Sequence, residues 1–242
     1  MMTVSLISAP GALASSQGAS AVRLAPVQQQ ASNQSASPSR LFTPVIHTST
    51  RRFLFISDTH FFHANILRFK DDTGKLTRPG FADVTEMNEL MLERWNQTVR
   101  KGDRVYHLGD VFMGQREEFQ KFWPRLAGQK SLIVGNHDDI PYLSKGGFFR
   151  KVQMWRKFTE YGLMLSHVPL HESSLGWRGN TLLNVHGHIH HNDSPPGPYL
   201  NVSVEKIDYR PVELDELIET RNSMLGPLNM PSLSVIESED DD

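Results

Sequence analysis

The 242-residue sequence contains no cysteine. A disulfide framework and a thiolate metal site are therefore excluded. Any metal ion must be held by nitrogen and oxygen ligands, a set that suits Mn, Zn, Fe or Ni. No apolar run approaches the roughly 20 residues that a membrane-spanning helix needs. The formal net charge is only −2, which argues against a membrane-bound protein and against a large nucleic-acid-binding surface.

Acidic residues are absent from residues 1–52, where serine, alanine, glutamine and proline dominate. Such a segment buries too little apolar surface to offset the entropy of ordering, so we expect a disordered extension. The composition also resembles an organelle transit peptide, but arginines are sparse and no amphipathic period is present. We therefore expect a cytoplasmic protein, with organelle targeting as the alternative. Residues 220–242 end in an acidic run and are expected to form a flexible tail.

Between these extensions, residues 53–219 are expected to form one α/β domain. Its strands are predicted where short, largely apolar runs occur, at Phe53–Ile56, Arg104–Leu108, Ser131–Val134, Gly162–Leu165 and Thr181–Val185. Runs of this kind are typical of strands that are covered on both faces. Helical spacing of apolar residues predicts helices at Glu86–Val99 and Arg116–Leu126. A final strand pair at Tyr199–Glu205 and Tyr209–Leu214 is expected to lead into a short helix at Asp215–Glu219.

A histidine-rich hexapeptide, His186–His191, follows the last of the five apolar runs. If its backbone is extended, His188 and His190 point to the same side, about 7 Å apart. Two metal ions about 3.5–4 Å apart could each take one of these imidazoles. Gly187 lacks the Cβ that would crowd this approach. The hexapeptide alone is equally consistent with a histidine-rich surface turn.

Metal-competent side chains follow every one of the five apolar runs. They are Asp58 and His60, then Asp110, then Asn136 and His137, then His167, then His188 and His190. Each alone has an ordinary explanation, such as a helix cap, a turn residue or a packed core histidine. Their recurrence at the carboxyl ends of five strands, where α/β sheets gather ligands, favours one shared site.

The ordered motifs Asp58-Thr59-His60, Gly109-Asp110, Gly135-Asn136-His137-Asp138, His167 and Gly187-His188-Ile189-His190 resemble those of the calcineurin-like metallophosphoesterases. The resemblance spans about residues 53–219. It implies a four-layer α/β sandwich, in which two mixed β-sheets pack face to face with helices outside. It also implies two divalent metal ions, manganese above all. By motif, Asp58, His60 and His190 would hold one ion, Asn136, His167 and His188 the other, and Asp110 would bridge them.

The resemblance further implies hydrolysis of a phosphoester by a hydroxide shared between two metals. His137 would act as general acid for the leaving group, with Asp138 as a candidate to orient its ring. His186 could orient a ligand or touch substrate, and His63 could also touch substrate. Arg78 and Arg178, with Lys75, are candidate phosphate contacts. For His63, Lys75, Arg78 and Arg178, an ordinary structural or solvated role is the favoured alternative.

Differences between this sequence and particular subfamilies of the metallophosphoesterases limit the types of phosphoester that it is expected to hydrolyse. Val111-Phe112-Met113-Gly114 stands where protein phosphatases and symmetrical dinucleoside tetraphosphatases carry Asp-Arg-Gly or Asn-Arg-Gly. The acid His137 is kept, unlike in the retromer-type scaffold members. The chain thus resembles compact single-domain bacterial and phage members, and we expect a phosphodiesterase acting on small or nucleotide-like diesters. A phosphomonoesterase, a nuclease or a metal-bound scaffold without activity are the alternatives, and the oligomeric state is open.

Overall fold

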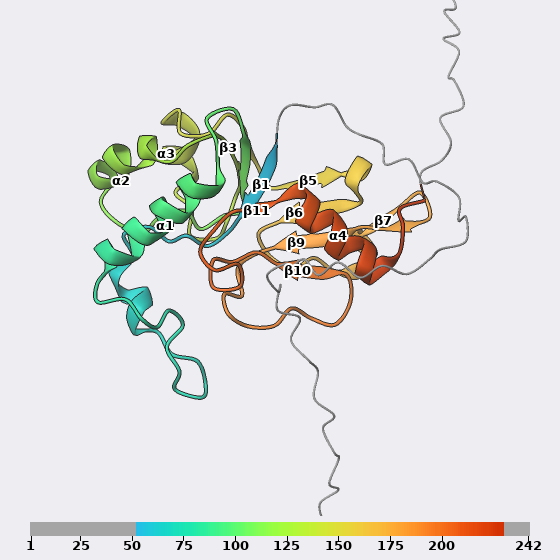
Figure 1. The fold of residues 1–242 in the computed structure, drawn as a ribbon, viewed down its shortest axis with the longest axis horizontal. Helices are drawn as coiled ribbons and strands as arrows, with labels where there is room; N and C mark the ends of the chain where they lie inside the picture. Colours follow the sequence, from blue (N-terminus) through green and yellow to red (C-terminus); the bar gives the residue numbers. More distant parts are fainter. Residues whose placement is uncertain (1–51, 230–242) are drawn as a thin grey trace, which may run out of the picture. The chain divides into compact units, whose positions relative to one another are not determined.

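The computed structural model describes residues 52–229, which form an α/β arrangement of two mixed sheets with helices (Figure 1). The fold class expected from the sequence is thereby confirmed. The extension and most of the acidic tail predicted above fall on residues 1–51 and 230–242, outside the described residues. None of the described helices is long and apolar enough to cross a lipid bilayer.

The first sheet has five strands in the order β11-β1-β2-β3-β4. Their bounds are Phe53–Ile56 for β1, Arg104–His107 for β2, Gln129–Ile133 for β3, Val152–Gln153 for β4 and Val212–Glu213 for β11. Strands β1 to β4 run parallel, whereas β11 pairs antiparallel with β1. The loops that follow β1, β2 and β3 therefore leave the same edge of the sheet.

The second sheet has four strands in the order β10-β9-β6-β5. Their bounds are Trp155–Phe158 for β5, Leu163–Ser166 for β6, Leu183–His186 for β9 and Tyr199–Asn201 for β10. Strands β6, β9 and β10 are parallel, and β5 is antiparallel to β6. A separate hairpin joins β7 (Gly176–Trp177) to β8 (Asn180–Thr181) just before β9.

Aromatic side chains hold the two sheets face to face. The ring of Phe158 on β5 packs edge-on against Tyr106 on β2, with ring centroids 5.1 Å apart, and against Phe53 on β1, at 5.7 Å. All three belong to or pack against one hydrophobic core that also takes Leu163 and Val185 from the second sheet. Edge-to-face aromatic packing adds to the burial of apolar area, so the core lies between the sheets.

Within residues 52–229, four α-helices and four short 3-10 helices accompany the sheets. The α-helices are Val84–Thr98 (α1), Arg116–Phe122 (α2), Ile140–Lys145 (α3) and Leu214–Leu225 (α4). The 3-10 helices are Ala64–Arg68, Trp123–Arg125, Thr159–Tyr161 and Glu172–Ser174. Asp83 caps α1 by accepting the backbone N–H groups of Thr85 and Glu86.

Two sequence expectations need correction. The predicted final strand pair does not exist, because β10 pairs with β9 in the second sheet while β11 pairs with β1 in the first. The last helix runs to Leu225 instead of Glu219, because a capping box at Glu213 and Glu216 starts it and Gly226 ends it at φ 76°. The other predicted strands and helices are present, with ends that shift by at most four residues.

Candidate metal centre

The site begins where strands of both sheets end. Beyond β1 and β2 the two loops stay hydrogen-bonded, from the Asp58 amide to the Gly109 carbonyl and from the His60 amide to the Asp110 carbonyl, both at 3.0 Å. The second sheet joins through the Gly187 amide, which donates to the His167 carbonyl at 2.8 Å. These backbone bonds bring side chains from four separate segments to one place.

A first group consists of Asp58, His60 and His190, whose ligand atoms lie within 4.8 Å of one another. His60 Nε2 is 3.9 Å from Asp58 Oδ1, and the His60 and His190 rings stack at 5.2 Å. Asp58 is held in place through its other oxygen, Oδ2, which accepts the Ser203 hydroxyl and the His188 amide, each at 2.9 Å. Oδ1 is therefore free to face the group.

A second group consists of Asp110, His167 and His188, also within 4.8 Å of one another. His167 Nδ1 lies 2.7 Å from the Leu108 carbonyl, so this nitrogen carries the proton and Nε2 is left as the ligand atom. The Asn136 amide oxygen lies 2.9 Å from His167 Nε2 and 2.9 Å from His188 Nδ1. Asn136 thus joins the second group, as the sequence motif implies.

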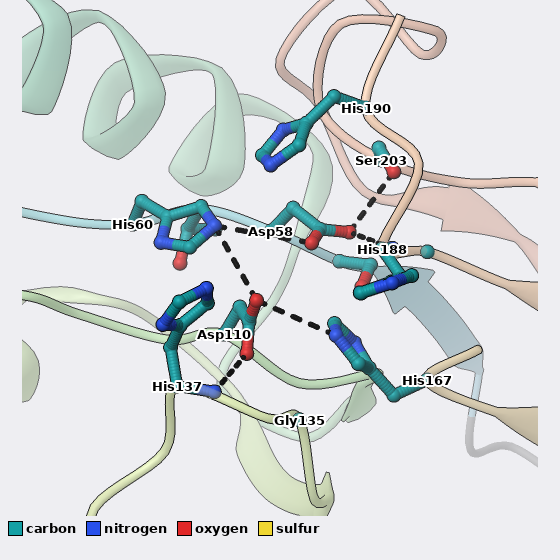
Figure 2. A network of polar contacts seen from close by, with 12 residues as sticks. Asp58, His60, Asp110, Gly135, His137, His167, His188, His190 and Ser203 are labelled. Carbon is teal, nitrogen blue, oxygen red and sulfur yellow. Dashed lines mark hydrogen bonds and ion pairs between the residues drawn. The ribbon is translucent and has the colours of Figure 1, made fainter. Parts of the chain in front are cut away.

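Asp110 lies between the two groups (Figure 2). Its Oδ2 is 3.5 Å from His60 Nε2 and 3.4 Å from His167 Nε2. Its Oδ1 accepts the backbone N–H of His137 at 2.9 Å, which fixes the carboxylate orientation. Burial alone would raise the pKa of Asp110, but the bond to His167 and that ring's charge bring the pKa well below its usual range. Asp110 is therefore ionised and placed to connect both groups.

The residues fit a pair of divalent cations. Asp58 Oδ1 and both ring nitrogens of His60 are buried and have no hydrogen-bond partner within the described part of the chain. Buried polar atoms of this kind are costly unless something satisfies them. Burial also lowers the pKa of His60 to about 2, so its imidazole is neutral, which is the form that binds metals. A set of two carboxylates and four imidazoles suits metal ions that prefer nitrogen and oxygen ligands.

Two glycines permit the close approach of the ligand-bearing segments. A Cβ on Gly187 would lie 2.6 Å from Ser57 Cβ, and closer still to Asp58 Oδ2. A Cβ on Gly135 would lie 2.5 Å from the Asp110 amide nitrogen. A Cβ on Gly187 would thus crowd Ser57 and the candidate ligand Asp58, as expected, and a Cβ on Gly135 would crowd Asp110.

The backbone of the ligand residues differs from the sequence expectation. The hexapeptide is not extended, because β9 ends at His186 while His188 and His190 have φ values of 71° and 52°. Asp58, His60 and Asp110 also have positive φ, at 57°, 43° and 58°. This left-handed conformation costs a non-glycine residue of order 1–3 kcal/mol and clusters at functional sites. The direction of these side chains is therefore set by the left-handed turns, and not by the alternation of side chains along an extended strand.

His137 and Asp138 follow Asn136 in the loop after β3 but lie differently from it. The exposed ring of His137 is edge-on to that of His60, with centroids 5.7 Å apart. Asp138 instead uses both oxygens on backbone amides, those of Gly135 at 2.8 Å, Val111 at 2.9 Å and Asp110 at 3.1 Å. Asp138 thus ties the loop after β2 to the loop after β3, and its contacts are with backbone and not with the His137 ring.

The four candidate substrate contacts are spread over different environments. His63 is half-buried beside the site, its ring 5.6 Å from that of His60. Arg78 is 1% exposed and its guanidinium is engaged by Glu205 and by the Asp58 and Thr59 carbonyls, so it offers no surface to a substrate. His186 is fully buried between the Gly187 carbonyl and the Ser194 hydroxyl, each at 2.9 Å.

The fourth candidate, Arg178, is exposed in the turn between β7 and β8, with its guanidinium over the Trp177 ring at 5.4 Å. This hairpin leads into the amino end of β9, whereas the metal-competent cluster follows the carboxyl end of that strand. Lys75 is exposed in the loop that precedes Arg78. Arg78 and His186 also adjoin the cluster but are buried, so among the described residues proposed as contacts only His63 is both beside the cluster and partly open to solvent.

Two residues of the site were missed by the sequence reading. Ser203 donates its hydroxyl to Asp58, and Glu205 accepts at 3.0 Å from His190 Nδ1. Burial raises the pKa of Glu205, but the Arg78 charge and the His190 bond prevail and bring it to about 2. Both residues lie beyond β10 in a segment that carries no recognisable motif. Their only sequence signal is that Ser203 interrupts, and Glu205 directly follows, the short apolar run Val202–Val204.

Comparisons with known proteins agree with this geometry. The sequence pattern of the family described as calcineurin-like phosphoesterase matches residues 51–224. The uncharacterized protein MJ1445 of Methanocaldococcus jannaschii is 35% identical over 180 residues, which cover 71% of this chain and 92% of that protein. The crystal structure of AQ665 from Aquifex aeolicus, a protein of unknown function, superposes with a TM-score of 0.55 at 27% identity. That match covers 70% of this chain and 99% of the Aquifex chain.

Proposed function

Because the chain belongs to the calcineurin-like phosphoesterase family, we propose that it is a two-metal phosphodiesterase acting on small or nucleotide-like diesters. The observation that carries this proposal is the position of Asp110, whose Oδ2 faces His60 Nε2 at 3.5 Å and His167 Nε2 at 3.4 Å. One carboxylate oxygen between two imidazoles of different groups is the arrangement that a bridged pair of cations needs.

The metal-holding residues divide as the two groups do. Asp58, His60 and His190 would hold one ion, Asn136, His167 and His188 the other, and Asp110 both. Bound divalent cations, Mn(II) favoured and Zn, Fe or Ni suitable, supply Lewis-acid stabilisation of phosphoryl charge and lower the pKa of water. The chain contributes imidazoles and carboxylates that hydrogen bonds hold in fixed orientations, so little reorganisation accompanies the reaction.

His137 is proposed as the general acid that gives a proton to the departing oxygen. Its ring is exposed to solvent and adjoins His60, while its backbone amide is anchored on Asp110 Oδ1. The ring can therefore reach a substrate above the cluster, while the amide bond keeps the residue in register with the bridging carboxylate. A proton donor matters most when the leaving group is a poor one.

The non-reacting part of the substrate is proposed to meet His63 and Phe69. These rings contact each other edge-on at 5.5 Å, and Phe69 is 50% exposed. An exposed aromatic ring beside an imidazole is a surface on which a planar group, such as a nucleobase, can stack. This supports nucleotide-like diesters over small aliphatic ones.

The experiment is a comparison of diester and monoester turnover by Mn(II)-loaded wild-type chain and His137→Ala. The variant should keep its metal, since the side chain of His137 belongs to neither ligand group, and should lose about 10²–10⁴-fold in turnover of an unactivated diester. An activated aryl diester should be affected far less, because its leaving group needs no proton.

Other outcomes would replace this proposal by a different one. Faster turnover of monoesters than diesters would make the chain a phosphatase, and preference for polymeric nucleic acid would make it a nuclease. Bound metal without hydrolysis of any phosphoester would favour a scaffold. Undiminished turnover of the unactivated diester by His137→Ala would remove His137 from the mechanism.

A further inference from the structure

Among the groups outside the ligand set, one buried ion pair contacts two of the segments that carry the first group. Arg78 and Glu205 are 127 residues apart in sequence, and Arg78 Nε lies 2.6 Å from Glu205 Oε1. Their side chains are 0% and 3% exposed. A buried pair of this kind is weak evidence for stability alone, since apolar replacements are often as stable. Its position suggests another purpose.

On one side, the pair holds the Asp58–His60 turn. Arg78 donates to the Thr59 carbonyl through Nη1 at 2.9 Å and to the Asp58 carbonyl through Nη2. This turn has positive φ at Asp58 and His60, so it needs contacts that compensate its strain. A planar guanidinium can bond two successive carbonyls and a carboxylate at once, which a lysine ammonium does less well.

On the other side, the pair holds the ring of His190. Glu205 Oε1 lies 3.0 Å from His190 Nδ1, so this nitrogen carries the proton and Nε2 is left toward Asp58 and His60. A carboxylate behind a metal-binding imidazole fixes its tautomer and orientation and raises its basicity. Arg78 and Glu205 together therefore contact Asp58 and His190 directly, and they hold the Thr59 carbonyl next to His60.

The second group is held by different contacts. His167 is oriented by the Leu108 carbonyl at 2.7 Å, and Asp110 is oriented by the His137 amide at 2.9 Å. No described contact joins Arg78 or Glu205 to His167, to Asn136 or to His188 within residues 52–229.

We infer that Arg78 and Glu205 are positioning residues that set the affinity of the Asp58–His60–His190 metal site without setting that of the other site. The inference rests on the proposed two-metal function. It assigns to Arg78 a place beneath the metal centre instead of at the substrate.

The test is a Mn(II) titration of the metal-free full-length chain by calorimetry, with Glu205→Asp as the main variant. Aspartate keeps a negative charge opposite Arg78 but is one methylene shorter, so it withdraws from His190. We expect the affinity of one site to fall about 10–100-fold and that of the other to remain unchanged. His60→Ala and His167→Ala, which each remove a ligand from one group, identify the two binding events.

A matched control is Glu89→Asp. Glu89 and Arg125 form a bidentate pair at 2.7 Å, but on the surface, with side chains 49% and 48% exposed. The same substitution should leave both metal affinities unchanged. Arg78→Lys is a second variant, which keeps the charge but loses the guanidinium fork, and it should also weaken only the first site.

A measurement on the wild-type chain does not depend on any variant. Long-range ¹H–¹⁵N correlation of the Zn(II)-loaded protein should show His190 protonated at Nδ1. Equal weakening of both sites in Glu205→Asp, unchanged affinities in that variant, or a proton on His190 Nε2 would each overturn the inference. Failure of the wild-type chain to bind two ions would instead overturn the proposed function.

Discussion

Gly187→Ala isolates a single physical effect at the centre of the site. The structure puts the added Cβ 2.6 Å from Ser57 Cβ, and nearer to Ser57 Oγ and Asp58 Oδ2. The backbone of Gly187 does not have a positive φ, so alanine is conformationally allowed and the penalty is one of space alone.

The neighbours of this Cβ cannot easily move away. Ser57 Cβ is fixed to the buried backbone beyond β1, where the Ser57 amide donates to the Val202 carbonyl at 3.0 Å. Asp58 Oδ2 is held by Ser203 and His188 at 2.9 Å each. Overpacking in such a place costs typically about 1–3 kcal/mol. Displacement of Asp58 should also weaken its metal site by an amount comparable to loss of an outer-shell contact, about 10–100-fold.

The assay combines urea denaturation of the metal-free chain with Mn(II) calorimetry. Gly176→Ala is the matched control, because a Cβ there meets nothing within 4 Å and the glycine likewise has no positive φ. We expect the control to bind two ions with wild-type affinity. Wild-type stability and wild-type affinity at both sites in Gly187→Ala would refute the claim that this glycine is required by the approach of β9 to Asp58.

Three further predictions concern stability. Asp138→Asn should lower the free energy of unfolding by about 1.5–3 kcal/mol, because the side-chain amide has only one oxygen to accept the three backbone N–H groups that both carboxylate oxygens accept. Urea denaturation tests this prediction, with the exposed Asp193→Asn as the control. Equal denaturation midpoints for the two variants would contradict it. Burial lowers the pKa of His107 from 6.5 to about 3, so the unfolded chain takes up the proton first and stability should fall as the pH drops from about 6.5 to about 3, by at most about 5 kcal/mol. His107→Gln keeps an N–H for the Thr59 hydroxyl and should show a smaller loss between pH 7 and pH 4; parallel losses would exclude this source. Mn(II) at 100 times its dissociation constant should stabilise the chain by about 2.7 kcal/mol per site, measured as a concentration-dependent rise in Tm that EDTA reverses; a Tm insensitive to Mn(II) would argue against a native metal site.

Some strands of the two sheets could be predicted from the sequence, and others could not. Five strands can be predicted from the sequence as short apolar runs, because both of their faces are buried: β1, β2, β3, β6 and β9. Strand β5, Trp155–Phe158, is not such a run, since it lies at a sheet edge where Trp155 and Lys157 are exposed. The pairing of strands could not be predicted from the sequence either, because no local sequence feature of β11 specifies that it pairs with β1 instead of β10.

The candidate ligand set could be predicted from the sequence alone, because metal-competent residue types recur directly after the apolar runs and form an ordered motif set. Only the tertiary structure decided which oxygen of Asp110 faces both groups. It also decided that five residues reach the site through left-handed turns, namely Asp58, His60, Asp110, His188 and His190. The Arg78–Glu205 pair is the clearest case. A contact across 127 residues leaves no local pattern, because its energy depends on burial and orientation that exist only once the chain has folded.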